Sequence, residues 1–121
     1  MALLTNPSSS EVRVCNPSRP LDAPAVVLGE LWAGFLLGKQ RRANEAELEA
    51  FLSNPVVEEV PIDAGVARLY AEILAALRKA GTPIPTNDIW VAAQAMETGA
   101  ELLSFDRHYD AVDGLAWRRL E

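Results

Sequence analysis

Three acidic residues stand beside apolar segments, where a folded chain has little structural use for a charge. Asp88 begins the alanine-rich stretch "DIWVAAQA", Asp106 follows the apolar run at 102–105, and Glu30 lies within "PAVVLGELWAGFLLG". Carboxylates brought within ~4 Å of one another repel by ~4 kcal/mol at an effective dielectric of about 20. Such a group persists only when some members are protonated or when a cation lies between them. A shared site at these positions therefore predicts a bound metal ion.

The residue types restrict which ion this would be. Cys15 and His108 are the only cysteine and the only histidine, too few to form a zinc site. Oxygen ligands select hard cations, so the expected ion is Mg²⁺ or Mn²⁺. A divalent cation held by carboxylates and waters suits phosphodiester hydrolysis, because it orients a water and neutralises charge that develops on the phosphate.

Each acid taken alone also has a simpler structural explanation. An aspartate near a helix N-terminus, as expected for Asp88, is favourable by ~0.3–1 kcal/mol. Asp106 after a strand suits a local turn, and Glu30 suits an ion pair at the edge of the core. Asp110, four residues after Asp106, is expected to face solvent. On spacing alone, a shared metal site and separate structural roles both stay open.

Composition limits the class of protein. The 121 residues, of which 50% are hydrophobic and 23% charged, predict a single globular domain over residues 1–121. The apolar runs are too short for a membrane span, and the N-terminus lacks a signal-peptide pattern, so a cytoplasmic protein without membrane contact is expected. A net charge of −6 argues against a general nucleic-acid binder, but it is compatible with an acidic cleft that attracts divalent cations.

The elements that must position the acids alternate between helices and strands. The patterns predict helices at 24–37, 44–52, 64–80 and 87–98, a helical turn at 109–112, and strands at 3–4, 12–15, 56–60, 101–105 and 116–120. Asp63 is the expected N-cap of the third helix, and an Asn44–Glu47 pair predicts a capping box for the second. Gly81 and Gly99 are the expected C-caps of the third and fourth helices. The alternation predicts an α/β domain with a mainly parallel sheet.

The stretches "PAVVLGELWAGFLLGKQRRANEAELEAFL", "VEEVPIDAGVARLYAEILAALRKAGTPIPTNDIWVAAQAMETGAELLSFDRHYDAV" and "GLAWRRLE" resemble PIN-domain ribonucleases, specifically the VapC-type toxins of prokaryotic toxin–antitoxin pairs. "GTPIPTNDIWVAAQA" is the most specific part. The resemblance implies a three-layer α/β/α sandwich with a mainly parallel central sheet. It also implies Mg²⁺- or Mn²⁺-dependent cleavage of RNA, a homodimer, and inhibition by a cognate antitoxin.

By the same resemblance, Glu30, Asp88 and Asp106 match three acidic residues of the family's catalytic metal site, with Asn87 as a polar neighbour of Asp88. Family members open with a strand that ends in Asp-Thr-Asn or Asp-Ser-Asn. Here "MALLTNPSSS" puts Leu4 at the position of that aspartate, and residues 1–22 are expected to be atypical and irregular. Asp22 is not expected to replace the missing acid, because it precedes the second element.

The loss of one of four acids predicts weaker metal affinity. We therefore expect an endoribonuclease toxin of impaired activity. The alternative is a catalytically inactive PIN-fold module that still binds an antitoxin or another partner protein, for which Trp32, Phe35 and Leu36 are candidate apolar contacts. A third interpretation is an unrelated α/β domain whose acids serve as helix caps and a turn residue.

Overall fold

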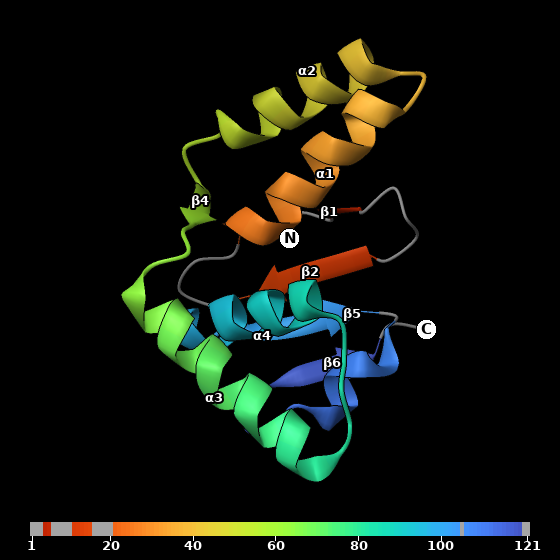
Figure 1. The fold of residues 1–121 in the computed structure, drawn as a ribbon. Helices are drawn as coiled ribbons and strands as arrows, with labels where there is room; N and C mark the ends of the chain where they lie inside the picture. Colours follow the sequence, from red (N-terminus) through yellow and green to blue (C-terminus); the bar gives the residue numbers. More distant parts are fainter. Residues whose placement is uncertain (1–3, 6–10, 16–20, 105, 120–121) are drawn as a thin grey trace.

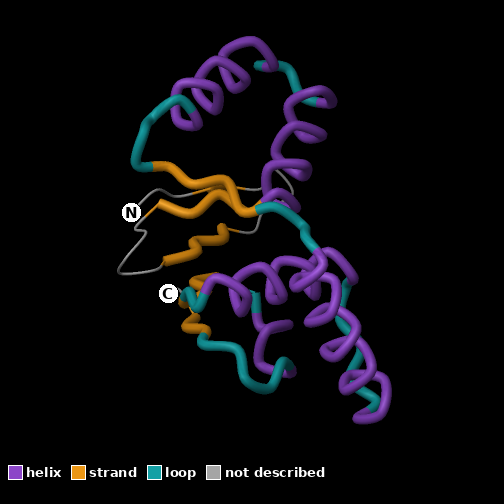
Figure 2. Tube along the Cα trace, turned by 90° about the vertical axis from the view of Figure 1, so that its left-hand side faces the viewer, coloured by secondary structure: helices purple, strands orange, loops and turns teal. Residues whose placement is uncertain are grey.

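A computed structural model describes residues 4–5, 11–15, 21–104 and 106–119. The strands are β1 (Leu4–Thr5), β2 (Glu11–Cys15), β3 (Leu21–Pro24), β4 (Val57–Val60), β5 (Glu101–Ser104) and β6 (Trp117–Arg119). The helices are α1 (Ala25–Leu37), α2 (Arg41–Leu52), α3 (Ala64–Ala80) and α4 (Thr86–Thr98), with a 3₁₀ helix η1 (Arg107–Ala111). β2 lies between α1 and α4, and β5 and β6 lie beside α4 (Figures 1 and 2). Within the described ranges, no helix has the length and apolar composition that crossing a membrane requires.

The strands confirm the α/β class but form two separate sheets. β3 pairs with β4 and β5 pairs with β6, both in parallel, as the alternation of helices and strands predicts. β1 pairs with β2 and β2 pairs with β5, both antiparallel, so the larger sheet has the order β1-β2-β5-β6. Parallel neighbours need a crossover of a dozen or more residues, and the short connection between β1 and β2 permits only the antiparallel arrangement. Residues 1–22, expected to be irregular, thus contribute two strands and the start of a third.

Local signals fix the ends of the long helices. Asp63 Oδ1 accepts a hydrogen bond from Val66 N at 2.9 Å, which confirms Asp63 as the N-cap of α3. α3 and α4 end at Gly81 and Gly99, whose φ angles of 70° and 67° lie in the left-handed region that glycine adopts without strain. Both C-caps were expected from the sequence, and both are confirmed.

Two local predictions were wrong. α2 begins at Arg41, so Asn44 lies inside the helix, where its N–H donates to the Gln40 carbonyl at 3.0 Å, and no capping box forms at its start. Arginine and alanine are good helix formers and extend the helix toward its N-terminus. β3 was not predicted at all, because "LDAP" has little strand propensity. Its parallel ladder with β4 forms the strand instead.

The core lies mainly around α4, which packs against α3, α1 and β5. Its buried members from these four elements include Val27, Leu31, Val66, Ile73, Leu77, Ile89, Ala92 and Leu102. The ring of Trp90 on α4 stacks on that of Tyr70 on α3, with centroids 3.8 Å apart. Trp117 on β6 lies 6.0 Å from the ring of Tyr109. Both tryptophans therefore serve packing, as expected.

One buried polar side chain joins three elements. Gln94 on α4 is fully buried, and its Nε2 donates to the carbonyl oxygen of Val60 at 2.7 Å and to that of Pro61 at 3.3 Å. Its Oε1 accepts from the backbone N–H of Val26 at 3.3 Å. Gln94 thereby links α4, which carries Asp88, to the end of β4 and the first turn of α1.

Gln94→Met is expected to lower the free energy of unfolding by about 2 kcal/mol, because methionine has a similar size but leaves buried backbone groups without their partner. For a chain of this length that is a fall in Tm of about 8 °C, measured by calorimetry or circular dichroism. Gln40→Met makes the same change at an exposed glutamine and is the matched control. Equal stability of the two variants would show that the Gln94 hydrogen bonds contribute nothing.

Candidate metal centre

The first turn of α4 positions Asp88. The carbonyl of Pro85 accepts from the N–H of Asp88 at 3.0 Å and from that of Ile89 at 3.3 Å, which starts the helix. The side chain of Ile89 is fully buried and anchors this turn in the core. The Asp88 carboxylate, on the neighbouring position, keeps 21% of its surface exposed and lies at the edge of the core.

The turn after β5 positions Asp106. The N–H of Asp106 donates to Ser104 Oγ at 3.1 Å, and Asp106 Oδ1 accepts from the N–H of His108 at 2.9 Å. This local hydrogen bond caps η1, so the structural role considered for Asp106 is present. It also orients the carboxylate, which is 24% exposed, toward α4.

Asp88 and Asp106 meet at a histidine. His108 Nδ1 lies 2.8 Å from Asp88 Oδ2 and 2.9 Å from Asp106 Oδ1. The hydroxyl of Tyr109 donates to the other oxygen of Asp88, Oδ1, at 3.4 Å. The ligand atoms of the two aspartates and His108 all lie within 4.8 Å of one another, close enough to hold one metal ion. We call these three residues the carboxylate–histidine group.

Glu30 faces the same region but is not a member of this group. It lies half-buried on α1. Among the residues that the structure describes, the carboxylate–histidine group comprises Asp88, Asp106 and His108 alone. The charge of Glu30 nevertheless acts on the buried hydroxyl of Tyr109. The role assigned to Glu30 stays a prediction.

The electrostatics of the site resist further negative charge. Burial raises the pKa of Asp88 above its usual value, and the nearby charge of Asp106 adds to this effect, while hydrogen bonding to His108 opposes it. Burial also raises the pKa of Tyr109 far above its usual range, and the charges of the surrounding acids raise it further. A bound cation would neutralise this excess of negative charge, so the residues present fit a divalent metal ion.

The other polar residues considered from the sequence are not members of the carboxylate–histidine group among the described residues. Asp110 is exposed, as expected. Asp22, in β3, is 4% exposed and is not a member of the carboxylate–histidine group among the described residues. Asn87, the expected polar neighbour of Asp88, is exposed.

Leu4, which the resemblance puts at the position of the family's first aspartate, lies on the edge strand of the described sheet. Leu4 in β1 is in register with Val12 in β2, which is in register with Ser104 in β5. Two strand spacings of ~4.8 Å separate the backbones of Leu4 and Ser104 by roughly 10 Å. The strand adjacent to β5 on this side is therefore β2, not β1.

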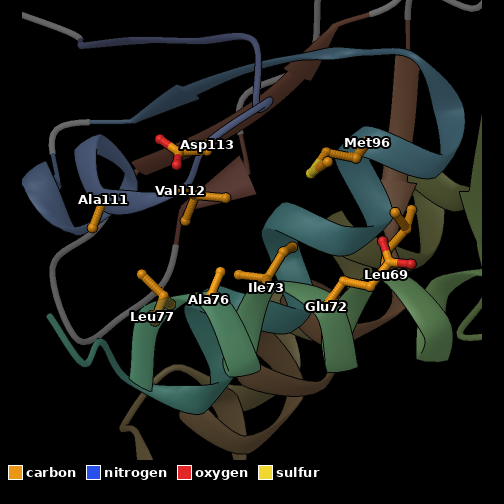
Figure 3. A pocket seen from close by; sticks show the side chains of 9 residues that line it. All are labelled: Leu69, Glu72, Ile73, Ala76, Leu77, Met96, Ala111, Val112 and Asp113. Atoms are coloured by element: carbon orange, nitrogen blue, oxygen red, sulfur yellow. The ribbon is translucent and has the colours of Figure 1, made fainter. Parts of the chain in front are cut away.

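A separate hollow lies between α3, α4 and η1 (Figure 3). Its volume is about 120 Å³, and it is lined by Leu69, Glu72, Ile73, Ala76, Leu77, Met96, Ala111, Val112 and Asp113. The lining is mainly apolar and includes no member of the carboxylate–histidine group. This hollow is therefore distinct from the candidate metal centre.

His108 is the site residue that sequence reasoning missed. The single histidine was set aside because it cannot complete a zinc site with one cysteine. The available signal was its position two residues after Asp106, since a short turn at the end of a strand keeps such neighbours together. Its approach to Asp88 joins residues twenty positions apart and required the packing of α4 against η1.

An α/β fold with paired acids at the start of α4 and after β5 is the architecture of a PIN domain. The family model described as "PIN domain" matches residues 21–115, and the chain belongs to this family. Ribonuclease VapC4 of Mycobacterium tuberculosis is 33% identical over 87 residues, which cover 72% of this chain and 67% of that protein. Among solved structures, VapBC2 from Rickettsia felis bound to a DNA fragment from their promoter gives a TM-score of 0.74 at 25% identity, covering 83% of this chain and 74% of that one. VapBC-5 from Mycobacterium tuberculosis, a member of the VapBC family of toxin-antitoxin systems, gives 0.69 at 27% identity, covering 88% and 85%.

Proposed function

We propose that this protein is a divalent-metal-dependent endoribonuclease toxin of a VapBC-type toxin–antitoxin system, active on RNA in the cytoplasm. The observation that carries the proposal is the meeting of Asp88 and Asp106, within a chain similar over most of its length to ribonuclease VapC4. Neither aspartate is explained by capping alone, because each also directs an oxygen toward His108.

Asp88 and Asp106 would hold the ion, Mg²⁺ or Mn²⁺, with Glu30 approaching from α1. A divalent ion bound there supplies Lewis-acid stabilisation of the phosphate and activation of a water. Tyr109 holds Asp88 through Oδ1 and leaves Oδ2 directed toward the centre. The His108 N–H holds Asp106 differently, because it donates to Oδ1, the same oxygen that faces the imidazole. These fixed carboxylates pre-organise the site, which lowers the cost of positioning the attacking water.

Impaired activity is part of the proposal. Among the described residues the group holds two carboxylates at close range, with Glu30 outside it, and the resemblance puts Leu4 where the family has its first aspartate. Fewer carboxylates weaken the attraction for a divalent ion. We therefore propose a ribonuclease that needs higher metal concentrations than one with a complete set of acids.

The partner surface would lie on α1. Leu36 and Leu37 are 55% and 89% exposed, and Trp32 packs edge-to-face on Phe35 with ring centroids 5.9 Å apart. An exposed apolar group on a helix is typical of a protein–protein interface. We assign this surface to the cognate antitoxin, and we propose that the protein itself forms a homodimer.

A second candidate function is a catalytically inactive module that binds the antitoxin without cutting RNA. Leu4 at the expected aspartate position favours it. Such a module would use the α1 surface to bind the antitoxin and would need no metal-dependent reaction. The two candidates differ in one measurable property, which is cleavage of RNA by the isolated protein.

The test is cleavage of a panel of structured RNAs by the purified, antitoxin-free protein with Mn²⁺, with Mg²⁺ and with EDTA. Metal-dependent cleavage that Asp88→Asn removes would support the ribonuclease. Activity in Leu4→Asp but not in the natural chain would identify a site that lacks only its first ligand. No cleavage by any of the three proteins would favour the binding module.

A further inference from the structure

One nitrogen atom stands at the centre of the site. His108 Nδ1 lies 2.8 Å from an oxygen of Asp88 and 2.9 Å from an oxygen of Asp106. A neutral imidazole has at most one hydrogen on this atom, so it cannot donate a full, linear hydrogen bond to both carboxylates at once. The arrangement instead directs three potential ligand atoms toward one another.

These separations match the edges of a metal coordination sphere. Two ligands held at right angles by bonds of about 2.1 Å, the length typical of small divalent ions with oxygen or nitrogen, are separated by roughly 3.0 Å. The two distances from Nδ1 to the carboxylate oxygens are close to this value. An ion that replaced the proton on Nδ1 would have all three ligand atoms nearby, since these atoms lie within 4.8 Å of one another.

The surrounding contacts leave this position open. Tyr109 occupies Oδ1 of Asp88, not the Oδ2 that faces His108. Asp106 Oδ1, which faces the imidazole, already accepts from the backbone N–H of His108, and a carboxylate oxygen has a second lone pair for an ion. The His108 side chain is 45% exposed, so an ion has access from solvent.

We infer that His108 is a nitrogen ligand of the metal ion in this protein and that it shifts the preference of the site from Mg²⁺ toward Mn²⁺ and other transition-metal ions. This inference rests on the proposed metal-dependent function and extends it to the identity of the ion. Imidazole binds transition metals in preference to Mg²⁺, which favours oxygen ligands and retains its waters. A nitrogen ligand also occupies a coordination position in a site with few carboxylates.

Pulsed electron paramagnetic resonance of the Mn²⁺-loaded protein tests this directly, because a coordinated imidazole nitrogen modulates the electron spin echo. His108 is the only histidine in the sequence, so in protein without a histidine tag any imidazole signal must come from it. We expect nitrogen modulation in the natural protein and its loss in His108→Asn. The ratio of Mg²⁺ to Mn²⁺ dissociation constants, measured by calorimetric titration, is expected to fall at least ~10-fold in the same variant.

Arg107→Gln, a change at the exposed neighbouring position, is the control for effects of altering η1, and it should keep the nitrogen signal. Thermal unfolding of each variant verifies that it is folded. Bound Mn²⁺ without nitrogen modulation would overturn the inference, as would an unchanged ratio of dissociation constants in His108→Asn.

These outcomes are separate from those that test the ribonuclease. Mn²⁺-dependent RNA cleavage without nitrogen modulation would reject His108 as a ligand and leave the proposed function standing. Nitrogen modulation in a protein that cuts no RNA would support His108 as a ligand and reject the proposed function, since the metal centre would exist without the proposed reaction. A protein that binds neither Mn²⁺ nor Mg²⁺ would overturn both.

Discussion

Replacing Asp106 with asparagine is expected to lower Mn²⁺-dependent RNA cleavage by at least ~10²-fold. Asparagine keeps the size of the side chain and can still accept the hydrogen bond from the His108 N–H, so the turn into η1 should survive. It removes the charge that attracts the ion. Stabilisation by a metal ion is worth several kcal/mol in a transition state, and each 1.36 kcal/mol is about a factor of ten in rate.

The matched control is Asp110→Asn, which makes the same change four residues later, inside the 3₁₀ helix that Asp106 caps. Asp110 is exposed and lies outside the carboxylate–histidine group, so its replacement should leave cleavage within about twofold of the natural rate. Rates are compared on one RNA at a fixed Mn²⁺ concentration. Full activity in Asp106→Asn would show that this aspartate is a turn residue and nothing more.

The fold could be predicted from the sequence wherever its signals are local. The cap at Asp63 and the glycines at 81 and 99 act within one helical turn, and each was placed correctly. β3 and the antiparallel course of β2 were not predicted, because they depend on pairing with strands distant in the chain. A four-residue strand such as "LDAP" carries no periodic pattern from which it can be recognised.

The candidate site likewise has residues that could be predicted from the sequence and one residue that could not. The aspartates at 88 and 106 could be predicted as candidates because each lies at the end of an element, where parallel α/β folds bind their ligands. His108 was missed because its role appears only when α4 and η1 are packed together. The sequence indicates which residues have the chemistry, but the distance between them is a property of the tertiary structure.

The Asp88→Asn variant should be more stable than the natural protein without metal and less stable with it. Burial raises the pKa of Asp88, so the folded state keeps this proton to a higher pH than the unfolded state. The contribution of Asp88 to the free energy of unfolding is therefore greatest below its ordinary pKa of 3.8 and falls as the pH rises through the raised value. At neutral pH the ionised Asp88 destabilises the metal-free fold, and asparagine removes this cost.

Metal binding is expected to reverse the order of stability of the natural protein and Asp88→Asn. An ion that binds only the folded state at a concentration of 100 times its dissociation constant stabilises that state by about 2.7 kcal/mol. At ~4 °C per kcal/mol this raises the Tm of the natural protein by roughly 10 °C. Asp88→Asn loses a charged ligand, so the same Mn²⁺ concentration should leave its Tm nearly unchanged.

The measurement is a pair of melting curves for each protein at neutral pH, one in EDTA and one in Mn²⁺, with Asp110→Asn as the control that should follow the natural protein. The order of the two Tm values should reverse: the Tm of Asp88→Asn should be the higher one in EDTA and the lower one in Mn²⁺. This reversal distinguishes a metal ligand from a helix-start residue. If Asp88 only interacted favourably with the N-terminus of α4, its variant would have the lower Tm under both conditions. An equal difference in Tm between the variant and the natural protein in EDTA and in Mn²⁺ would therefore show that Asp88 has a purely structural role.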